Sequence, residues 1–294
     1  MTLFKSSTSS HYRSDFILGF FLKGAACISG VIIFIISWYL IKESIPVLKA
    51  VSFLRFFTDS GWFPTEGLFN TIPMLTGTLL ATMLSVLIAT PLGIASALFC
   101  HYYAPKPISK IYRSILEVMA GIPSVVYGFW GLVVLVPIIG SIRPPGSSLL
   151  AGSLILVVMI LPTLALMLDG TLSHIPTQYI QGAASLGLSR WGMIRHVILP
   201  ASKSGMITGV ILQTGRAIGE TMAILMVCGN VVQNPKSIFD PIRTLTSNIA
   251  LEMAYASGSH RSALFVSGLI LMGLIVLLVG AAEIISHEHI YEEK

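Results

Sequence analysis

Residues 178–200 read QYIQGAASLGLSRWGMIRHVILP, a polar stretch between two strongly apolar segments. The spacing predicts two short helices joined by a turn. Pro176 suits the first turn of the first helix, where its missing N–H would have no partner. Gly187 is placed to end that helix, and Ser189 to cap the next one. A chain that keeps such a compact helical loop outside the bilayer is expected to present it to a soluble partner.

The composition is that of a membrane protein. Of 294 residues, 54% are hydrophobic and 11% are charged, and the mean hydropathy is +0.83. An ordinary soluble domain carries about 25% charged residues. The basic residues behind the net charge of +5 are scattered among loops, which suits the flanks of membrane spans and predicts no nucleic-acid partner. Cys27, Cys100 and Cys228 form no metal spacing or disulfide framework and are expected to be small buried residues.

Six apolar segments are long enough to cross a bilayer, which requires about 20 mostly apolar residues. They are residues 20–41, 73–98, 114–136, 149–168, 205–228 and 263–285. The predicted fold is therefore an all-α polytopic membrane protein with six transmembrane helices. Small residues precede the first apolar core rather than follow it, so this segment is expected to remain as an anchor. Pro91, Pro123 and Pro162 predict kinks that neighbouring helices accommodate.

Basic residues are slightly more frequent in one set of short loops, which predicts that both termini and the 178–200 stretch are cytoplasmic. Residues 1–72 would then comprise the N-terminal segment, the first span and an external loop. Residues 73–285 would form the core, with a cytoplasmic loop at 171–204, and residues 286–294 a cytoplasmic tail. The external loop contains FLRFFTDSGWFPTEGLF at 53–69. Its aromatic residues are expected to lie as a belt at the outer membrane interface, with a docking surface for an external partner as the alternative. They are Phe53, Phe56, Phe57, Trp62 and Phe63.

Charged residues in the fifth segment are candidates for function. Arg216 and Glu220 are four residues apart, so they are expected to share a helical face and to pair. Gln213 lies one turn earlier on much the same face. An intramembrane charge is costly unless it is paired or faces water, so this group should point into the bundle or a cavity. Two interpretations stay open: a static pair that joins helices, or an arginine that binds an anionic substrate bidentately while Glu220 is its resting partner.

Two small-xxx-small patterns in the same segment predict close helix packing. They are formed by Gly205 with Gly209 and by Gly215 with Gly219.

Other titratable residues receive weaker assignments. Glu117, near the inner end of the third segment, is expected to reach the headgroup region, with a gating partnership as the alternative. Asp169 and Glu283 stand at span ends, where the interface can solvate them. His174 and His196 flank the loop without a set of metal-ligating partners, so no metal site is predicted.

The 171–204 loop resembles the cytoplasmic coupling loop, or EAA loop, of ABC importer permeases, which docks into a cleft on the ATP-hydrolysing subunit. The likeness rests on Gln181-Gly182-Ala183, on Gly187, and on Leu199-Pro200. Gln181 stands where the family has glutamate, and Gly182 where it has alanine. The resemblance implies that the residues docking on the ATPase are Gln181, Gly182, Ala183, Ala184, Leu186 and Gly187.

Further segments extend the resemblance over most of the chain, to the Pst-type permeases of bacterial phosphate ABC importers. They are GTLL at 77–80 with ATPLG at 89–93, AGIPSVVYG at 120–128 and GRAIGETMA at 215–223. The last segment, with MVCGN at 226–230, is more similar to the PstC-type than to the PstA-type member. The resemblance implies the type I importer permease fold, with Arg216 and Glu220 in the substrate path, and Gln213 is expected to join them.

The resemblance also implies a multi-pass subunit of a bacterial or archaeal cytoplasmic membrane, surrounded by membrane lipid. Its partners would be a PstA-type permease, a dimer of a cytoplasmic ATP-binding subunit and an extracytoplasmic phosphate-binding protein. The chain has no G-x-x-x-x-G-K-[ST] loop, so it is expected to be no enzyme and to bind no cofactor, with ATP on the partner. The alternatives are a permease for sulfate, molybdate or phosphonate, and a proton-coupled secondary transporter that uses Glu220 and Glu117.

Overall fold

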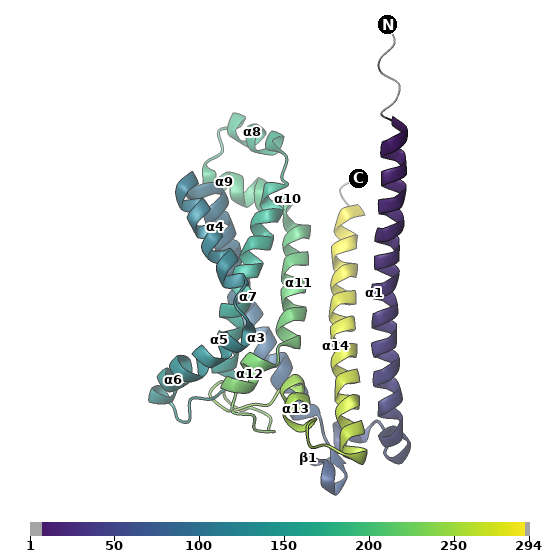
Figure 1. The fold of residues 1–294 in the computed structure, drawn as a ribbon. Helices are drawn as coiled ribbons and strands as arrows, with labels where there is room; N and C mark the ends of the chain where they lie inside the picture. Colours follow the sequence, from purple (N-terminus) through teal and green to yellow (C-terminus); the bar gives the residue numbers. More distant parts are fainter. Residues whose placement is uncertain (1–7, 292–294) are drawn as a thin grey trace.

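The computed structural model describes the backbone of residues 8–291 and the side chains of residues 18–280. Most of the described chain is helical, and the long helices run side by side in one bundle (Figure 1). Five helical stretches among the described residues are long and apolar enough to cross a membrane. They are Leu18–Ala50, Ile72–Tyr103, Ser124–Ile142, Leu149–Ser173 and Gly258–Gly280. The sequence predicts six, and the difference lies in its fifth segment.

The centre of the bundle is formed by α3 (Ile72–Leu98) and α7 (Leu149–Ser173). A Cβ at Gly93 of α3 would lie 2.9 Å from Leu164 Cδ2 of α7, so the absence of a side chain lets the two helices approach closely. Leu164 itself is 1% exposed. Pro91 and Pro162 lie inside these two helices without ending them.

At one side of the bundle, α1 (Thr8–Ala50) lies along α14 (Gly258–Tyr291) (Figure 1). The rings of Tyr39 and Phe265 meet edge to face, with centroids 5.7 Å apart. Most other side chains of α1 are exposed, as expected of a helix that faces lipid. Cys27 is among them, so the prediction of three buried cysteines is wrong for this residue, whereas Cys100 and Cys228 are buried.

The predicted third span, residues 114–136, is interrupted. One helix, α4 (Lys106–Ala120), ends before Pro123, and α5 (Ser124–Trp130) begins after it. A π-helical turn, η3 (Gly131–Leu135), leads on to α6 (Val136–Ile142). Proline lacks the N–H of a continuing helix and disfavours helical geometry in the preceding residue, so Pro123 separates two helices instead of kinking one.

The predicted fifth span, residues 205–228, is interrupted as well. It consists of α11 (Lys203–Gly219) and α12 (Met222–Val227), with Glu220 extended between them at φ −68° and ψ 129°. The Glu220 carboxylate accepts a hydrogen bond from the Ala223 N–H at 3.1 Å, which caps the start of α12. The Thr246 hydroxyl donates to the Glu220 carbonyl at 2.8 Å. A glycine of low helix propensity next to a capping acid explains why the helix stops here.

The end of the bundle opposite α8 carries the short elements. These are α2 (Arg55–Thr58), β1 (Trp62–Phe63), η1 (Pro64–Glu66), β2 (Leu68–Phe69) and α13 (Leu245–Glu252), and the two strands pair antiparallel. Phe56 and Trp62 are buried here in a second small core with Phe69, whereas Phe53 and Phe63 are 50% and 56% exposed. The predicted aromatic belt is therefore wrong for Phe56 and Trp62, because these rings hold the loop to the bundle.

Asp59 fastens the same loop. Its carboxylate accepts hydrogen bonds from Arg55 Nε at 2.9 Å and from the Phe69 N–H at 3.0 Å. The hydrogen bond from Arg55, with smaller contributions from Phe69 and from the Arg55 charge, holds the Asp59 pKa below its ordinary value of 3.8, against an opposing effect of burial.

A carboxyl group whose pKa is lowered by folding stabilises the fold above its ordinary pKa and loses that contribution as the pH falls through the folded pKa. We therefore expect Asp59→Asn to increase hydrogen exchange across residues 55–71 at pH 7. In the wild type, the same loosening should appear only below about pH 3.8. The exposed Glu66 is the matched control, and Glu66→Gln should change nothing. Equal exchange in Asp59→Asn and the wild type at pH 7 would contradict the role of this carboxylate.

The polar stretch at 178–200 folds into α8 (Thr177–Ser185) and α9 (Arg190–Met193). It lies at the same end of the bundle as the beginning of α1 and the end of α14, with α13 and β1 at the opposite end (Figure 1). The loop and both ends of the described chain thus share one side, which the sequence predicts to be cytoplasmic.

Candidate functional site

The turn of the coupling loop (residues 171–204) is built around Gly187. Its φ of +71° lies in the left-handed region, where glycine has no steric penalty. The N–H of Gly187 donates to the Ala184 carbonyl at 3.0 Å, and that of Leu188 to the Ala183 carbonyl at 3.1 Å. These two bonds form a Schellman motif that ends α8. Ser189 Oγ accepts the Gly192 N–H at 3.1 Å and caps α9, as predicted.

Large apolar side chains are exposed on the otherwise polar surface of the coupling loop. Leu186 is 81% exposed, Trp191 59% and Tyr179 54%. Large exposed apolar side chains that lie together mark interaction sites on soluble surfaces. Of the predicted docking residues, Ala183 alone is buried, and Gln181, Gly182, Ala184, Leu186 and Gly187 are all exposed. We refer to Tyr179, Leu186 and Trp191 as the loop knob.

The loop is connected rigidly to the bundle. A π-helical turn, η4 (Ile194–Ile198), and the short α10 (Leu199–Ala201) join it to α11. A Cβ at Gly205 would collide with Thr171 of α7, and one at Gly209 would meet Leu168 at 3.4 Å. The first glycine pair therefore lies against α7, so that a displacement of the loop reaches both helices that flank it.

The second glycine pair does not pack within this chain. A Cβ at Gly215 or at Gly219 would meet nothing within 4 Å. Arg216, between them, is exposed. This face of α11 is open in the described part of the structure, unlike the face that carries Gly209.

Arg216 and Glu220 do not pair. Both side chains are described, and no hydrogen bond or ion pair joins them, because the helix ends at Gly219 and the Glu220 carboxylate caps α12 instead. Gln213 does not share the face of Arg216 either. It is 7% exposed and is held to α7, with its Oε1 accepting the Thr163 hydroxyl at 2.8 Å. The predicted polar group on one helical face is thus divided between a buried amide, an open cation and a capping acid.

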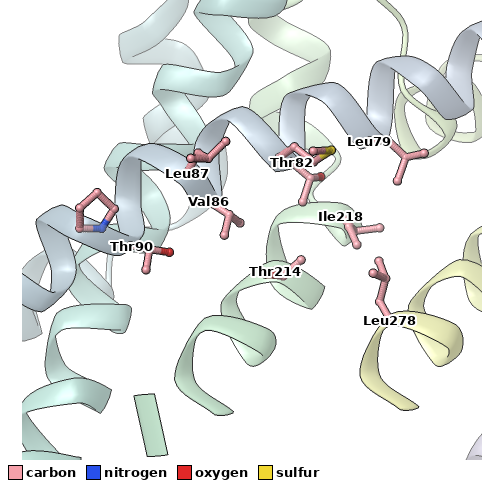
Figure 2. Close-up of a pocket in the computed structure, with 10 residues that line it drawn as sticks. Leu79, Thr82, Val86, Leu87, Thr90, Thr214, Ile218 and Leu278 are labelled. Atoms are coloured by element: carbon pink, nitrogen blue, oxygen red, sulfur yellow. The ribbon is translucent and has the colours of Figure 1, made fainter. Parts of the chain in front are cut away.

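A groove of about 610 Å³ lies beside this region, between α3, α11 and α14 (Figure 2). Its wall includes Val86, Leu87, Thr214, Ile218 and Leu278, and none of the described side chains that line it is charged. An apolar groove without a cation offers nothing to an inorganic anion. The open face of α11, which carries the exposed Arg216, is therefore a better candidate for the anion path than this groove.

A buried charge network lies at the opposite end of the bundle. Glu252, whose side chain is 9% exposed, accepts hydrogen bonds from Arg243 Nη1 at 2.7 Å and from Trp62 Nε1 at 2.9 Å. His260 Nε2 lies 2.8 Å from the same carboxylate. Arg243 also donates from Nε to the Asn230 carbonyl at 2.9 Å. The network borders a polar cavity of about 670 Å³. Sequence reasoning missed it, since its members are far apart along the chain and follow no motif.

A second network holds α4 to α7. Arg113 binds Asp169 with two nitrogens, at 2.9 and 3.0 Å, and His101 Nδ1 lies 3.3 Å from the same carboxylate. The expectation that Asp169 is simply solvated at a span end is therefore wrong. Glu117 is exposed on α4 near this network.

The other titratable residues singled out in the sequence form no metal site among the described residues. The side chain of Glu283 lies outside the described residues. His174 Nδ1 lies 2.7 Å from the Gly170 carbonyl, and His196 is exposed. Across the described part of the chain, no group of three or more metal-ligating His, Cys, Asp or Glu residues gathers.

These features define a class of protein: a helical membrane protein that presents an exposed helical loop at one end of its bundle. Comparison of the sequence identifies the family. The model of the binding-protein-dependent transport system inner membrane component matches residues 89–288, and the chain belongs to this family. Such permeases work with a substrate-binding protein and an ATPase.

Relatives and solved structures agree. The chain is 40% identical over 239 residues to the probable ABC transporter permease protein YqgH of Bacillus subtilis (79% of this chain, 77% of the relative). It is 32% identical over 245 residues to the phosphate transport system permease protein PstC of Mesorhizobium japonicum (76% and 74%) and to PstC of Haemophilus influenzae (76% and 78%).

A bacterial alginate ABC transporter has a similar chain, with a TM-score of 0.67, 17% identity and coverage of 96% and 98%. The methionine transporter MetNI gives a TM-score of 0.59 at 20% identity, covering 72% of this chain and 92% of that one. These likenesses confirm the importer-permease fold. The relatives are transport components, so the prediction of a membrane transport subunit rather than an enzyme is also confirmed.

Proposed function

We propose that this chain is the PstC-type permease subunit of an ATP-driven phosphate importer, where it forms half of the translocation path. The choice of phosphate is supported by relatives named PstC that match about three quarters of the chain at 32% identity. Membership in a binding-protein-dependent family argues against the proton-coupled alternative.

The observation that carries the proposal is the state of Arg216. It is an exposed guanidinium on the open face of α11, with no carboxylate bound to it among the described side chains and with a glycine on each side at 215 and 219. A guanidinium presents a planar set of N–H donors that fits a tetrahedral oxyanion bidentately. Because Glu220 caps α12, no internal acid has to leave before an anion reaches Arg216.

The proposed partners follow from the two free surfaces. The loop knob is an apolar surface for the cytoplasmic ATP-binding dimer, which would hold the ATP. The open face of α11 would meet a PstA-type permease across the path. An extracytoplasmic phosphate-binding protein would deliver the substrate at the end that carries α13, in a bacterial or archaeal cytoplasmic membrane.

Uptake of labelled phosphate at low micromolar supply, in cells that lack this chain and have no redundant carrier, tests the proposal. Labelled sulfate, molybdate and phosphonate uptake run in parallel. Selective loss of phosphate uptake, restored by the wild-type chain and sensitive to ATP depletion, is the expected result. Selective loss of another oxyanion would assign the permease to that substrate instead.

The coupling loop permits a matched pair of substitutions. Gly187→Asp puts a negative charge on the exposed turn. A Cβ there meets nothing within 4 Å, and aspartate tolerates the left-handed backbone better than most residues, so the added charge rather than misfolding should disturb docking. We expect the variant to insert in the membrane but to lose most uptake and most ATPase co-purification. Gly170→Ala is the control, because this residue lies in α7 outside the predicted docking set and a Cβ there would meet nothing within 4 Å. Normal uptake in Gly187→Asp would contradict the docking role.

A further inference from the structure

A polar cavity of about 590 Å³ lies at the coupling-loop end of the bundle, beside α4. Basic side chains dominate its lining: Lys106, Lys110 and Arg113, with His101 from the π-helical turn η2 (Phe99–Tyr103). Among the described side chains, Glu117 is the one acid in the lining. None of the residues proposed to contact the ATPase lines this cavity.

The two lysines are the available cations of this cavity. Lys106 and Lys110 are exposed, and neither has an ion pair among the described side chains. Arg113 is already bound to Asp169, so it forms a fixed wall. The first turn of α4 carries no acid, and no side chain caps its N-terminus at Pro105. The helix dipole therefore adds to the positive potential near Lys106.

A second, apolar cavity of about 430 Å³ adjoins the first along α4. It is lined by Ile111, Ile115, Val118 and Met119, and it shares Lys110 and Ser114 with the polar cavity. Ile111 is 63% exposed and Val118 70%. A cationic cavity that continues directly into an apolar one along the same helix fits a ligand with an anionic head and a hydrocarbon chain.

We propose that this double cavity binds an anionic phospholipid of the cytoplasmic leaflet. The headgroup phosphate contacts Lys106 and Lys110, and an acyl chain lies over Ile111, Ile115 and Val118. Basic cavities on the cytoplasmic side of membrane helices attract such lipids, because that leaflet carries the anionic headgroups. Inorganic phosphate would use the polar half alone and leave the exposed apolar half uncovered.

The test reconstitutes the complete transporter in phosphatidylcholine nanodiscs and measures phosphatidylglycerol binding by native mass spectrometry. The wild type should retain phosphatidylglycerol, and Lys106→Gln with Lys110→Gln should weaken its binding about tenfold or more. The control replaces Lys42 and Lys49, exposed lysines near the opposite end of the bundle, with glutamine. It should bind like the wild type. Equal weakening in both double variants would overturn the site.

A second pair of variants tests the chain. Ile111→Ser with Val118→Ser should weaken binding of long-chain phosphatidylglycerol but leave that of a short-chain analogue unchanged. Both side chains are exposed, so these substitutions do not disturb the core. Equal effects on both lipids, or displacement of the lipid from the wild type by inorganic phosphate, would overturn the proposal in favour of a free-anion site.

Discussion

Replacing Arg216 with Gln is expected to lower phosphate uptake by about ten- to a hundredfold while the transporter still assembles. Hydrogen bonds to charged groups are worth about 1.5–3 kcal/mol, and each 1.4 kcal/mol corresponds to a factor of ten. Arg216 is exposed and bonded to no acid in this chain, so its loss leaves no buried group unpaired. The measurement is initial uptake of labelled phosphate, normalised to the amount of assembled complex.

Two further variants test whether the effect is specific to position 216 and whether it depends on the planar guanidinium. Lys23→Gln removes an exposed cation on α1, at the side of the bundle and away from α11, and should transport normally. Arg216→Lys keeps the charge but not the planar donors, so an intermediate rate is expected. Uptake in Arg216→Gln equal to that of the wild type would remove the arginine from the path and leave the family assignment unaffected.

Replacing Arg243 with Ala is expected to destabilise the protein by about 3 kcal/mol. Breaking a buried ion pair by removing one partner costs about 3–5 kcal/mol, because the remaining charge stays buried. The lower end applies here, since the Arg243 side chain is 19% exposed, whereas that of Glu252 is 9% exposed. The measurement is thermal unfolding in detergent, followed through Trp62, whose indole N–H donates to Glu252.

A matched variant distinguishes the buried charge from general damage at this site. Arg243→Ala combined with Glu252→Gln removes the stranded carboxylate, so it should be more stable than Arg243→Ala alone. If the double variant is the less stable of the two, the cost comes from lost packing and not from the buried charge.

Sequence patterns were sufficient for the class of fold, because apolar length and loop chemistry are local properties. The Gly187 turn and the Ser189 cap follow from residue types at fixed offsets, and both form as predicted. The interruptions at Pro123 and at Glu220 were missed for different reasons. The same residue type predicts a kink at all three positions, but Pro91 and Pro162 lie inside continuous helices, whereas Pro123 separates α4 from α5.

At Glu220, the apolar segment around residues 205–228 is long enough to predict one continuous helix, whereas the break depends on hydrogen bonds. The Glu220 carboxylate caps α12, and the Thr246 hydroxyl, 26 residues further along, holds the Glu220 carbonyl. A four-residue spacing predicts pairing only if the helix continues. Because α11 ends at Gly219, the prediction that Arg216 pairs with Glu220 is wrong. The Glu252 network could not be predicted from the sequence either, because it depends on residues that are distant along the chain: Trp62 and Glu252 are 190 residues apart.

The break at Glu220 has a mechanical consequence. With 17 residues, α11 is a stiff arm about 25 Å long, attached to the coupling loop at one end and to an extended residue at the other. The Thr246 hydroxyl donates a hydrogen bond to the Glu220 carbonyl and so holds this end of α11 in place. We therefore expect a force applied at the loop to tilt α11, and with it Arg216, more than α12. A continuous helix would instead transmit the same force as a displacement of the whole helix along its axis.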